Sequence, residues 1–266
     1  MYGGTFCGRA AQWPRSFSLA GLVAGPWLAS LLFLLPTWSK AVAECIDATT
    51  LTHSTAGITS YFDDDERKAN PGLLGIRGTG WFLSLTSMVT AEHVATAMRL
   101  SDQSWKQVEI LDGETKQSTA VRILRVAGSN QEKIAVLELR SEYSGARGLK
   151  IRTQPLTPDE PVVSLAYPGN RLRIAKGRFV QYGDSDKFAG TALFEIYDGD
   201  DRLVLDHGAS GAPVLDCEGR VVAVVSNLFT QTLQFLSRAI KISTAWGQPN
   251  VVSVPIEVLR DSPRVK

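Results

Sequence analysis

From Gly75 onward the sequence is a succession of short apolar segments separated by turn residues, with few long stretches of helical period. Valine, isoleucine and aromatic residues dominate these segments, which is typical of strands. The tetrapeptide Asp216-Cys217-Glu218-Gly219 predicts a hairpin turn between two of them. Many short strands at this spacing favour an all-β fold, either an antiparallel sandwich or a barrel. The predicted strands are 80–85, 120–126, 134–139, 161–166, 178–182, 191–196, 212–215, 221–225 and 251–254.

A segment rich in glycine, proline and charge, residues 144–160, divides these strands into two similar groups. It predicts a boundary between two barrels, the first at about 54–150 and the second at about 160–259, with a cleft between them. Residues 44–70 are predicted to be irregular. Within them Asp63-Asp64-Asp65-Glu66 is expected to form a solvated turn; the alternative is a calcium loop, because oxygen ligands are present, although their spacing matches no standard loop.

The amino-terminal segment has the pattern of a secretory signal. Arg9 and Arg15 precede an apolar stretch from 17 to 36, which is followed by the small residues of Ala41-Val42-Ala43. We therefore predict a signal peptide over 1–43 and an exported mature chain over 44–266, either periplasmic or secreted. The alternative is an uncleaved anchor, because the apolar stretch approaches the length that spans a bilayer. A membrane is a predicted partner only in that case.

Cysteine number and net charge restrict the chemistry further. Cys7 lies in the predicted signal, so the mature chain retains Cys45 and Cys217. In an oxidising compartment this pair can form a disulfide that ties the amino terminus to a late part of the fold; two separate thiols are the alternative. The formal net charge of +1 gives no field that would attract polyanions, so nucleic acid is not an expected partner.

The segment 206–213, Asp-His-Gly-Ala-Ser-Gly-Ala-Pro, places Ser210 between small residues in a tight turn before a buried strand. Such a turn can expose a serine hydroxyl while neighbouring backbone amides point at the same place. The amides of Gly208 and Ser210 would then form a hole that stabilises an oxyanion. Glycine at 208 allows backbone turns that a Cβ would obstruct. Considered alone, this segment favours an ordinary glycine-rich turn.

A second segment, 78–94, is predicted to be a hairpin whose return strand ends in His93. The two segments together resemble the trypsin and chymotrypsin family of serine peptidases, particularly its bacterial trypsin-like, HtrA-like branch, over most of 75–259. The similarity is limited to the peptidase unit, since no PDZ domain follows. Six segments carry the resemblance in the family's order: Gly78-Thr79-Gly80-Trp81-Phe82, Val89-Thr90-Ala91-Glu92-His93-Val94, Ile134-Ala135-Val136-Leu137, Ala166-Tyr167-Pro168-Gly169, Gly208-Ala209-Ser210-Gly211-Ala212-Pro213 and Ser253-Val254-Pro255-Ile256.

The resemblance implies two six-stranded antiparallel Greek-key barrels of the chymotrypsin type, with the active site in the cleft between them. It also implies that Ser210 is the nucleophile and His93 the base of a cofactor-free endopeptidase that acts through an acyl-enzyme. One position departs from the family, because Lys133 occupies the place of its aspartate. An ammonium there would disfavour the charged imidazole, and Glu132 could take the role if the backbone bulges by one residue. Otherwise a different acid serves, or the enzyme is weak or inactive.

Specificity and alternative functions follow from the same resemblance. The family's primary pocket is placed at Val204, Ser226 and Asn227, and an apolar floor favours small or apolar substrate side chains. No metal site is predicted, because the histidines are scattered. The main rival function is a catalytically inactive relative that binds proteins, motivated by Lys133 and Glu92. The third hypothesis for the function is a membrane-tethered structural or adhesion domain.

Overall fold

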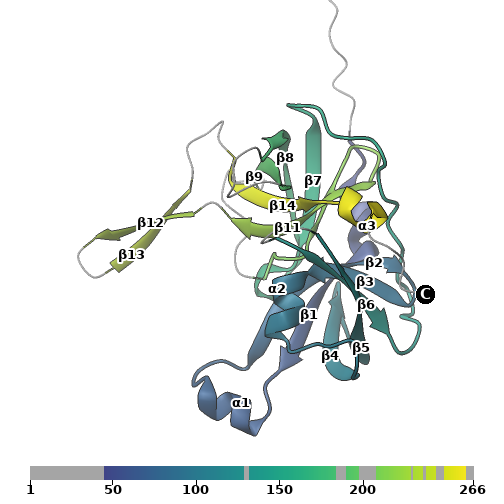
Figure 1. Cartoon of the computed structure of the whole chain (residues 1–266), viewed down its shortest axis with the longest axis vertical. Helices are drawn as coiled ribbons and strands as arrows, with labels where there is room; N and C mark the ends of the chain where they lie inside the picture. The colour runs from purple at the N-terminus through teal and green to yellow at the C-terminus, as the bar shows by residue number, and fades with distance from the viewer. Residues whose placement is uncertain are drawn as a thin grey trace, which may run out of the picture. The chain divides into compact units, whose positions relative to one another are not determined.

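The computed structural model describes residues 45–128, 132–183, 190–197, 208–228, 230–235, 238–243 and 249–261. Its strands form two closed antiparallel barrels of six strands each (Figure 1), ordered β1-β2-β3-β6-β5-β4 and β10-β11-β14-β9-β8-β7. The predicted pair of six-stranded Greek-key barrels is confirmed. The first barrel contains β1 (Thr55–Tyr61), β2 (Gly75–Ser84), β3 (Ser87–Ala91), β4 (Lys106–Asp112), β5 (Thr115–Ala127) and β6 (Ile134–Leu139). The second contains β7 (Pro161–Ala166), β8 (Arg173–Tyr182), β9 (Ala192–Tyr197), β10 (Pro213–Leu215), β11 (Val221–Leu228) and β14 (Val251–Pro255).

The remaining elements lie outside the barrel ladders. Strands β12 (Thr230–Phe235) and β13 (Arg238–Ser243) pair only with each other. Short helices occupy some connections: η1 (Ala48–Ser54), α1 (Asp64–Ala69), α2 (Glu92–Ala97), η2 (Pro168–Asn170) and α3 (Glu257–Asp261). The segment 144–160 falls between the last strand of the first barrel and the first strand of the second.

Three hydrophobic clusters hold the barrels together. One fills the interior of each barrel, and the third joins strands of both. In the third cluster Trp81 and Val89 of the first barrel pack in one group with Leu165, Leu215 and Val224 of the second, and all five are buried. A shared apolar cluster is removed from water only when the barrels are together. The site between them is therefore built on a fixed junction.

Strand β1 was not predicted, because residues 44–70 were expected to be irregular. All but the last of its residues are buried, so the strand shows no alternation of apolar and polar positions. Gly57 lies in the middle of it, where a Cβ would come within 3.2 Å of the Tyr167 Cβ. A side chain at this position would force Tyr167 to shift, and glycine removes the usual sequence signal of a strand.

The acidic run 63–66 forms a helix start, and the prediction of a solvated turn was wrong. Asp63 is the N-cap of α1; its carboxylate accepts from the Glu66 amide at 2.8 Å, while the Glu66 side chain accepts from the Asp63 amide. This is a capping box, which satisfies two otherwise unpaired amides. Asp64 and Asp65 pair with Arg67 and Lys68 one turn later. These carboxylates stabilise a helix, as negative charge does at its amino end.

The predicted hairpin strand ends two residues earlier than expected. Strand β3 stops at Ala91, and His93 is the second residue of helix α2. The Glu92 amide donates to the Lys133 carbonyl at 2.9 Å and thereby continues the pairing of β3 with β6 for one further residue. The chain then turns into helix α2, so His93 no longer follows the alternation of side chains along the strand.

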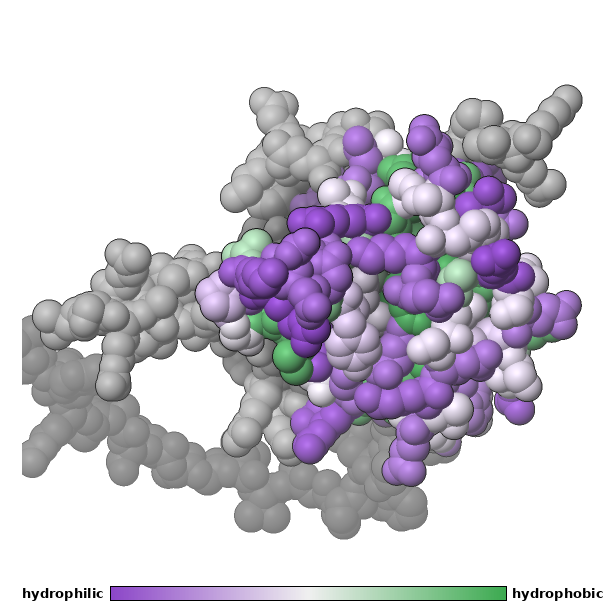
Figure 2. All heavy atoms as spheres, turned by 90° about the horizontal axis from the view of Figure 1, so that it is seen from below, coloured by the Kyte–Doolittle hydropathy of each residue, from purple (hydrophilic) through white to green (hydrophobic). Residues whose placement is uncertain are grey.

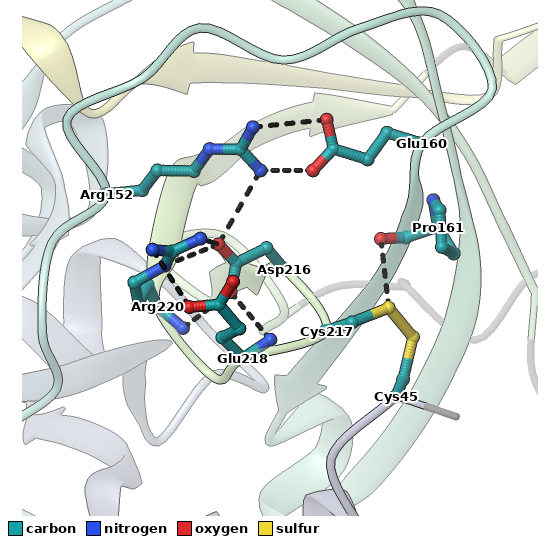
Figure 3. Close-up of a disulfide and its surroundings, with 8 residues drawn as sticks. All are labelled: Cys45, Arg152, Glu160, Pro161, Asp216, Cys217, Glu218 and Arg220. Atoms are coloured by element: carbon teal, nitrogen blue, oxygen red, sulfur yellow. Dashed lines mark hydrogen bonds and ion pairs between the residues drawn. A yellow bond between two sulfur atoms is a disulfide. The ribbon is translucent and has the colours of Figure 1, made fainter. Parts of the chain in front are cut away.

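The structure joins Cys45 and Cys217 in a disulfide (Figure 3), one of the two outcomes that the sequence left open. The Ile46 amide also donates to the Cys217 carbonyl at 2.9 Å, so the start of the described chain is attached to the β10–β11 turn. Ionic side chains surround this turn: Asp216 contacts Arg152 and Arg220, and Arg152 pairs with Glu160.

Removing this disulfide by replacing both cysteines with alanine is expected to lower the free energy of unfolding by about 4 kcal/mol. The bond closes a loop with a sequence separation of 172 residues, and crosslinks that close long loops restrict the unfolded chain most. Thermal unfolding of the mature chain should shift down by roughly 10 °C. The unmutated protein in dithiothreitol is the matched control, and an unchanged melting temperature there would contradict the prediction.

The surface seen from below the first barrel is mostly hydrophilic among the described residues, with scattered hydrophobic side chains (Figure 2). In the part of the chain that the structure describes, no helix has the length and apolar character needed to cross a membrane. The predicted signal, residues 1–43, lies outside the described residues, as does Cys7.

Candidate active site

Ser210 lies in a turn between the barrels that two glycines make possible. Gly208 and Gly211 have φ angles of +103° and +93°, in the region that favours glycine. A Cβ on Gly211 would lie 2.0 Å from the Thr79 carbonyl oxygen, so the turn approaches strand β2 too closely for any side chain. The Gly211 amide donates to the Val225 carbonyl at 2.7 Å, which fixes the turn to β11. Ser210 itself is half-buried.

The serine turn carries two backbone amides that have no acceptor among the described residues. Among the described residues, no carbonyl or side chain accepts a hydrogen bond from the amides of Gly208 or Ser210. Backbone amides in folded proteins are otherwise nearly always paired. These two were predicted to form an oxyanion hole, and their free state leaves them available to a negatively charged oxygen.

His93 is on helix α2, which packs against β2 next to the serine turn. A Cβ on Gly78 would lie 2.5 Å from Val94 Cγ1 and 3.4 Å from the Ser210 carbonyl oxygen, so Gly78 separates the histidine's helix from the serine's turn. The imidazole is accessible from solvent. Partial burial nevertheless lowers the pKa of His93 below its usual value, opposed by the negative charges of Glu132 and Glu92. A lowered pKa favours the neutral ring, which is the form that a base requires.

Ser226 connects the nucleophile with the rest of the site. The pairing of β11 with β14 shifts register between Val225 and Asn227, so Ser226 is the bulged residue. Its carbonyl is thereby free of the ladder and accepts from the Ser210 hydroxyl at 3.2 Å. Among the described residues, the Ser210 hydroxyl has no other hydrogen-bond partner, and it does not donate to His93 in this structure.

The Ser226 hydroxyl donates to the Glu132 carboxylate. Glu132, which precedes β6 of the first barrel, is thereby connected through Ser226 to the nucleophile turn of the second barrel. The Glu132 charge also acts on His93, where it favours the protonated ring. Glu132 was predicted as the third member only if the backbone departs from a regular strand. The structure begins β6 at Ile134, so the alternation of a strand does not apply at 132.

Lys133 stands at the place of the family's aspartate. Its carbonyl accepts from the Glu92 amide, and its side chain is half-exposed. The negative charges of Glu132 and Glu92 raise the pKa of His93, against the lowering effect of burial. Of the two neighbouring residues 132 and 133, Glu132 is therefore the one whose charge favours the protonated imidazole.

The predicted substrate pocket is described only in part. Val204 lies outside the described residues, and of Asn227 the structure describes the backbone, which pairs with Val252. Ser226 is buried, with its hydroxyl on Glu132 and its carbonyl on Ser210. The pocket remains a prediction for these three residues.

Sequence reasoning did not single out Thr79 or assign Ser226 to the Glu132 contact. Thr79 is fully buried in β2 and contacts the nucleophile turn through both its amide and its hydroxyl. A hydroxyl residue between two glycines in a strand was the available signal, because a buried hydroxyl requires partners. For Ser226 no signal was available, since a bulge depends on the partner strand.

The groups of this site are of the kinds that nucleophilic catalysis uses. They are a half-buried hydroxyl, two amides without an acceptor among the described residues, an imidazole with a lowered pKa and a carboxylate whose charge acts on that imidazole. Ser210 comes from the second barrel and His93 and Glu132 from the first, and Ser226 at the register bulge contacts both Ser210 and Glu132.

Comparisons with known proteins agree with this architecture. No curated protein matches the sequence. Among solved structures, the active form of the Rv3671c protease from M. tuberculosis is 17% identical, with a TM-score of 0.50, covering 94% of this chain and 92% of that one. Deg5 is 14% identical, with a TM-score of 0.51, over 80% of this chain and 88% of that one. The HtrA-type protease AlgW with tripeptide is 12% identical, with a TM-score of 0.52, over 80% of this chain and 60% of that one.

Identities this low support the fold alone, and a sequence-based match supplies the family. The family model described as a trypsin-like peptidase domain matches residues 78–224, which is more than half of the 266-residue chain and includes His93, Glu132 and Ser210. With the two barrels and the site at their junction, this chain belongs to the family of trypsin-like peptidase domains.

Proposed function

We propose that this protein is an exported serine endopeptidase that hydrolyses peptide bonds through an acyl-enzyme on Ser210. The observation that carries the proposal is the serine turn: the turn that carries the Ser210 hydroxyl also carries two amides, of Gly208 and Ser210, that have no acceptor among the described residues. A structural serine would not require free amides at its side, whereas a nucleophile that generates an oxyanion does.

In the first half of the reaction, the Ser210 oxygen attacks the carbonyl carbon of the scissile peptide bond. His93 takes the hydroxyl proton, and the carbonyl oxygen becomes an oxyanion held by the amides of Gly208 and Ser210. Glu132 stabilises the imidazolium through its charge. His93 then gives the proton to the leaving nitrogen, the carbon–nitrogen bond breaks, and an ester remains on Ser210.

In the second half, a water molecule attacks the ester carbon while His93 takes one of its protons. The same two amides hold the second oxyanion, and the proton passes back to the Ser210 oxygen as the carboxylic acid leaves. Each proton transfer is assigned to a residue of the chain, so no cofactor enters the proposal.

Export and the peptide nature of the substrate are part of the same proposal. Support for export is the signal pattern over 1–43, together with a Cys45–Cys217 pair placed to bond, which suits an oxidising compartment. Support for a peptide substrate is that AlgW, a structural neighbour, is described with a tripeptide. The prediction of small or apolar side chains at the primary pocket is retained with it.

Labelling with a fluorophosphonate probe is the direct test. The mature chain from Glu44, prepared with its disulfide formed, is expected to bind one probe, and mass spectrometry of the digest should place it on Ser210. The reason is that such probes react with a serine only when a base and an oxyanion hole activate it. Casein hydrolysis should accompany the labelling.

The Ser210→Ala variant and heat-denatured wild type are the controls, and neither should be labelled. A folded wild type that neither reacts with the probe nor cleaves casein would overturn the proposal and favour a binding module without catalysis. Labelling on a serine other than Ser210 would contradict the assignment of the nucleophile while leaving the hydrolase class intact.

A further inference from the structure

We infer that Thr79, a residue of the first barrel, is a positioning residue for the oxyanion hole of the second; the inference rests on the proposed function. Thr79 lies in β2 opposite Gly57 and is completely buried. A buried hydroxyl requires partners, and a threonine in a barrel interior costs stability compared with valine unless it is hydrogen-bonded. The partners of this hydroxyl are both in the second barrel.

Thr79 binds both ends of the serine turn. Its hydroxyl donates to the Gly208 carbonyl at 2.6 Å, and its amide donates to the Ser210 carbonyl at 2.9 Å. One residue thus holds the carbonyls of the same two residues whose amides are free. The Ala209 side chain, between them, is buried, so the turn has little room to move away from β2.

The Thr79 hydroxyl restricts the backbone conformation of Gly208, which glycine itself leaves free. Glycine adopts positive and negative φ angles almost equally well, so nothing in Gly208 itself maintains its φ of +103°. Peptide units are planar, so holding the Gly208 carbonyl fixes the unit that it shares with the Ala209 amide, and this unit lies between the two units that carry the Gly208 and Ser210 amides. A hydrogen bond to the Gly208 carbonyl therefore selects one of the backbone states that glycine allows.

Two further hydrogen bonds hold Thr79 itself in place. Its hydroxyl accepts from the Tyr167 amide at 3.0 Å, and its carbonyl accepts from the Thr90 hydroxyl at 2.7 Å. The Tyr167 phenol oxygen in turn accepts from the Gly113 amide at 3.0 Å, at the β4–β5 turn. A side chain with fixed partners can orient a catalytic backbone more accurately than one that rotates freely.

The discriminating variants are Thr79→Val, which keeps the branched shape and the backbone amide, and Thr79→Ser, which keeps the hydroxyl. Loss of one oxyanion donor typically costs about 10²–10³ in kcat. We expect Thr79→Val to lower kcat about 10²-fold and to weaken binding of a peptide aldehyde, which forms an oxyanion on Ser210, by a similar factor. KM should stay within about threefold, because the ground-state substrate does not use the hole.

Ser164→Ala is the matched control. Ser164 is also fully buried and donates to a backbone carbonyl, that of Pro213, at 2.8 Å, and among the described residues its hydroxyl has no hydrogen bond to residues 208–210. It should lose stability as Thr79→Val does while kcat stays within about threefold of wild type. Thr79→Ser should also retain kcat within about fivefold, since the hydrogen bond to Gly208 remains.

The outcomes separate this inference from the proposed function. A wild type without turnover overturns both. If the wild type is active and kcat is unchanged in Thr79→Val, the inference alone is overturned. It is also overturned if kcat of Thr79→Ser falls as far as that of Thr79→Val, because the methyl group and not the hydroxyl would then be what matters. If Thr79→Val does not fold, Thr79→Cys takes its place. A thiol is a weaker donor, so kcat should fall about tenfold, and wild-type kcat in Thr79→Cys would again overturn the inference.

Discussion

Replacing His93 with alanine is expected to lower kcat for peptide hydrolysis about 10⁶-fold, because the base and the nucleophile act as a unit. The Ser210 hydroxyl is a poor nucleophile until a base removes its proton. His93 is on helix α2, which packs on β2 beside the serine turn, and burial lowers the pKa of its ring, which favours the neutral form. Steady-state hydrolysis of a chromogenic peptide gives kcat directly.

His53→Ala is the matched control for the loss of an imidazole. His53 Nδ1 lies 3.1 Å from the Asp112 carboxylate, so this second histidine also has an acid partner. Asp112 is at the end of β4, and neither residue contributes to the pKa of His93. His53→Ala should leave kcat within about threefold of wild type. Equal losses in the two variants would show that the His93 effect is structural.

The pH profile of the wild type gives a second readout of His93. Activity requires the neutral ring, so kcat/KM should fall as pH drops through the His93 pKa. Because burial lowers this pKa, the fall should occur at a more acidic pH than for a histidine with its usual value. If kcat/KM instead began to fall at a pH above the usual histidine pKa, the assignment of His93 as the base would be contradicted.

The barrels could be predicted because most of their strands carry the signal on which such predictions depend. Strands such as β6 and β7 are short apolar stretches bounded by turn residues, and the two glycine-rich segments have a recognisable order along the chain. Strand β1 carries no such signal, since it is buried on both faces and contains Gly57. The place of β1 in the barrel is determined by its two partner strands, β2 on one side and β4 on the other.

The residues of the site were predictable in type, and the contacts among them were not. Ser210, His93 and the two amides follow from the glycine-rich segment and its partner hairpin. The Glu132 contact depends on two departures from regular strand geometry, a strand that starts only at Ile134 and a bulge at Ser226. Both are decided by neighbouring strands in space, so a pattern along one segment does not contain them.

The second large effect concerns Glu132. Replacement with glutamine is expected to lower kcat about 10⁴-fold, as loss of the triad carboxylate does in trypsin-type enzymes. Glutamine has nearly the same shape and can still accept from the Ser226 hydroxyl, so the change removes charge and leaves the contact. Without that charge the imidazolium formed during attack is less stable, and the His93 pKa should drop further.

Two measurements distinguish this loss from a structural one. The acidic limb of kcat/KM should move to lower pH in Glu132→Gln, because a negative charge that raises the His93 pKa is gone. Lys133→Gln, which places glutamine at the neighbouring position, should leave kcat within about threefold, since the proposed role is that of the Glu132 charge. If Lys133→Gln instead raises kcat and Glu132→Gln leaves it unchanged, another acid orients the base, and the contact of Glu132 with Ser226 only joins the two barrels.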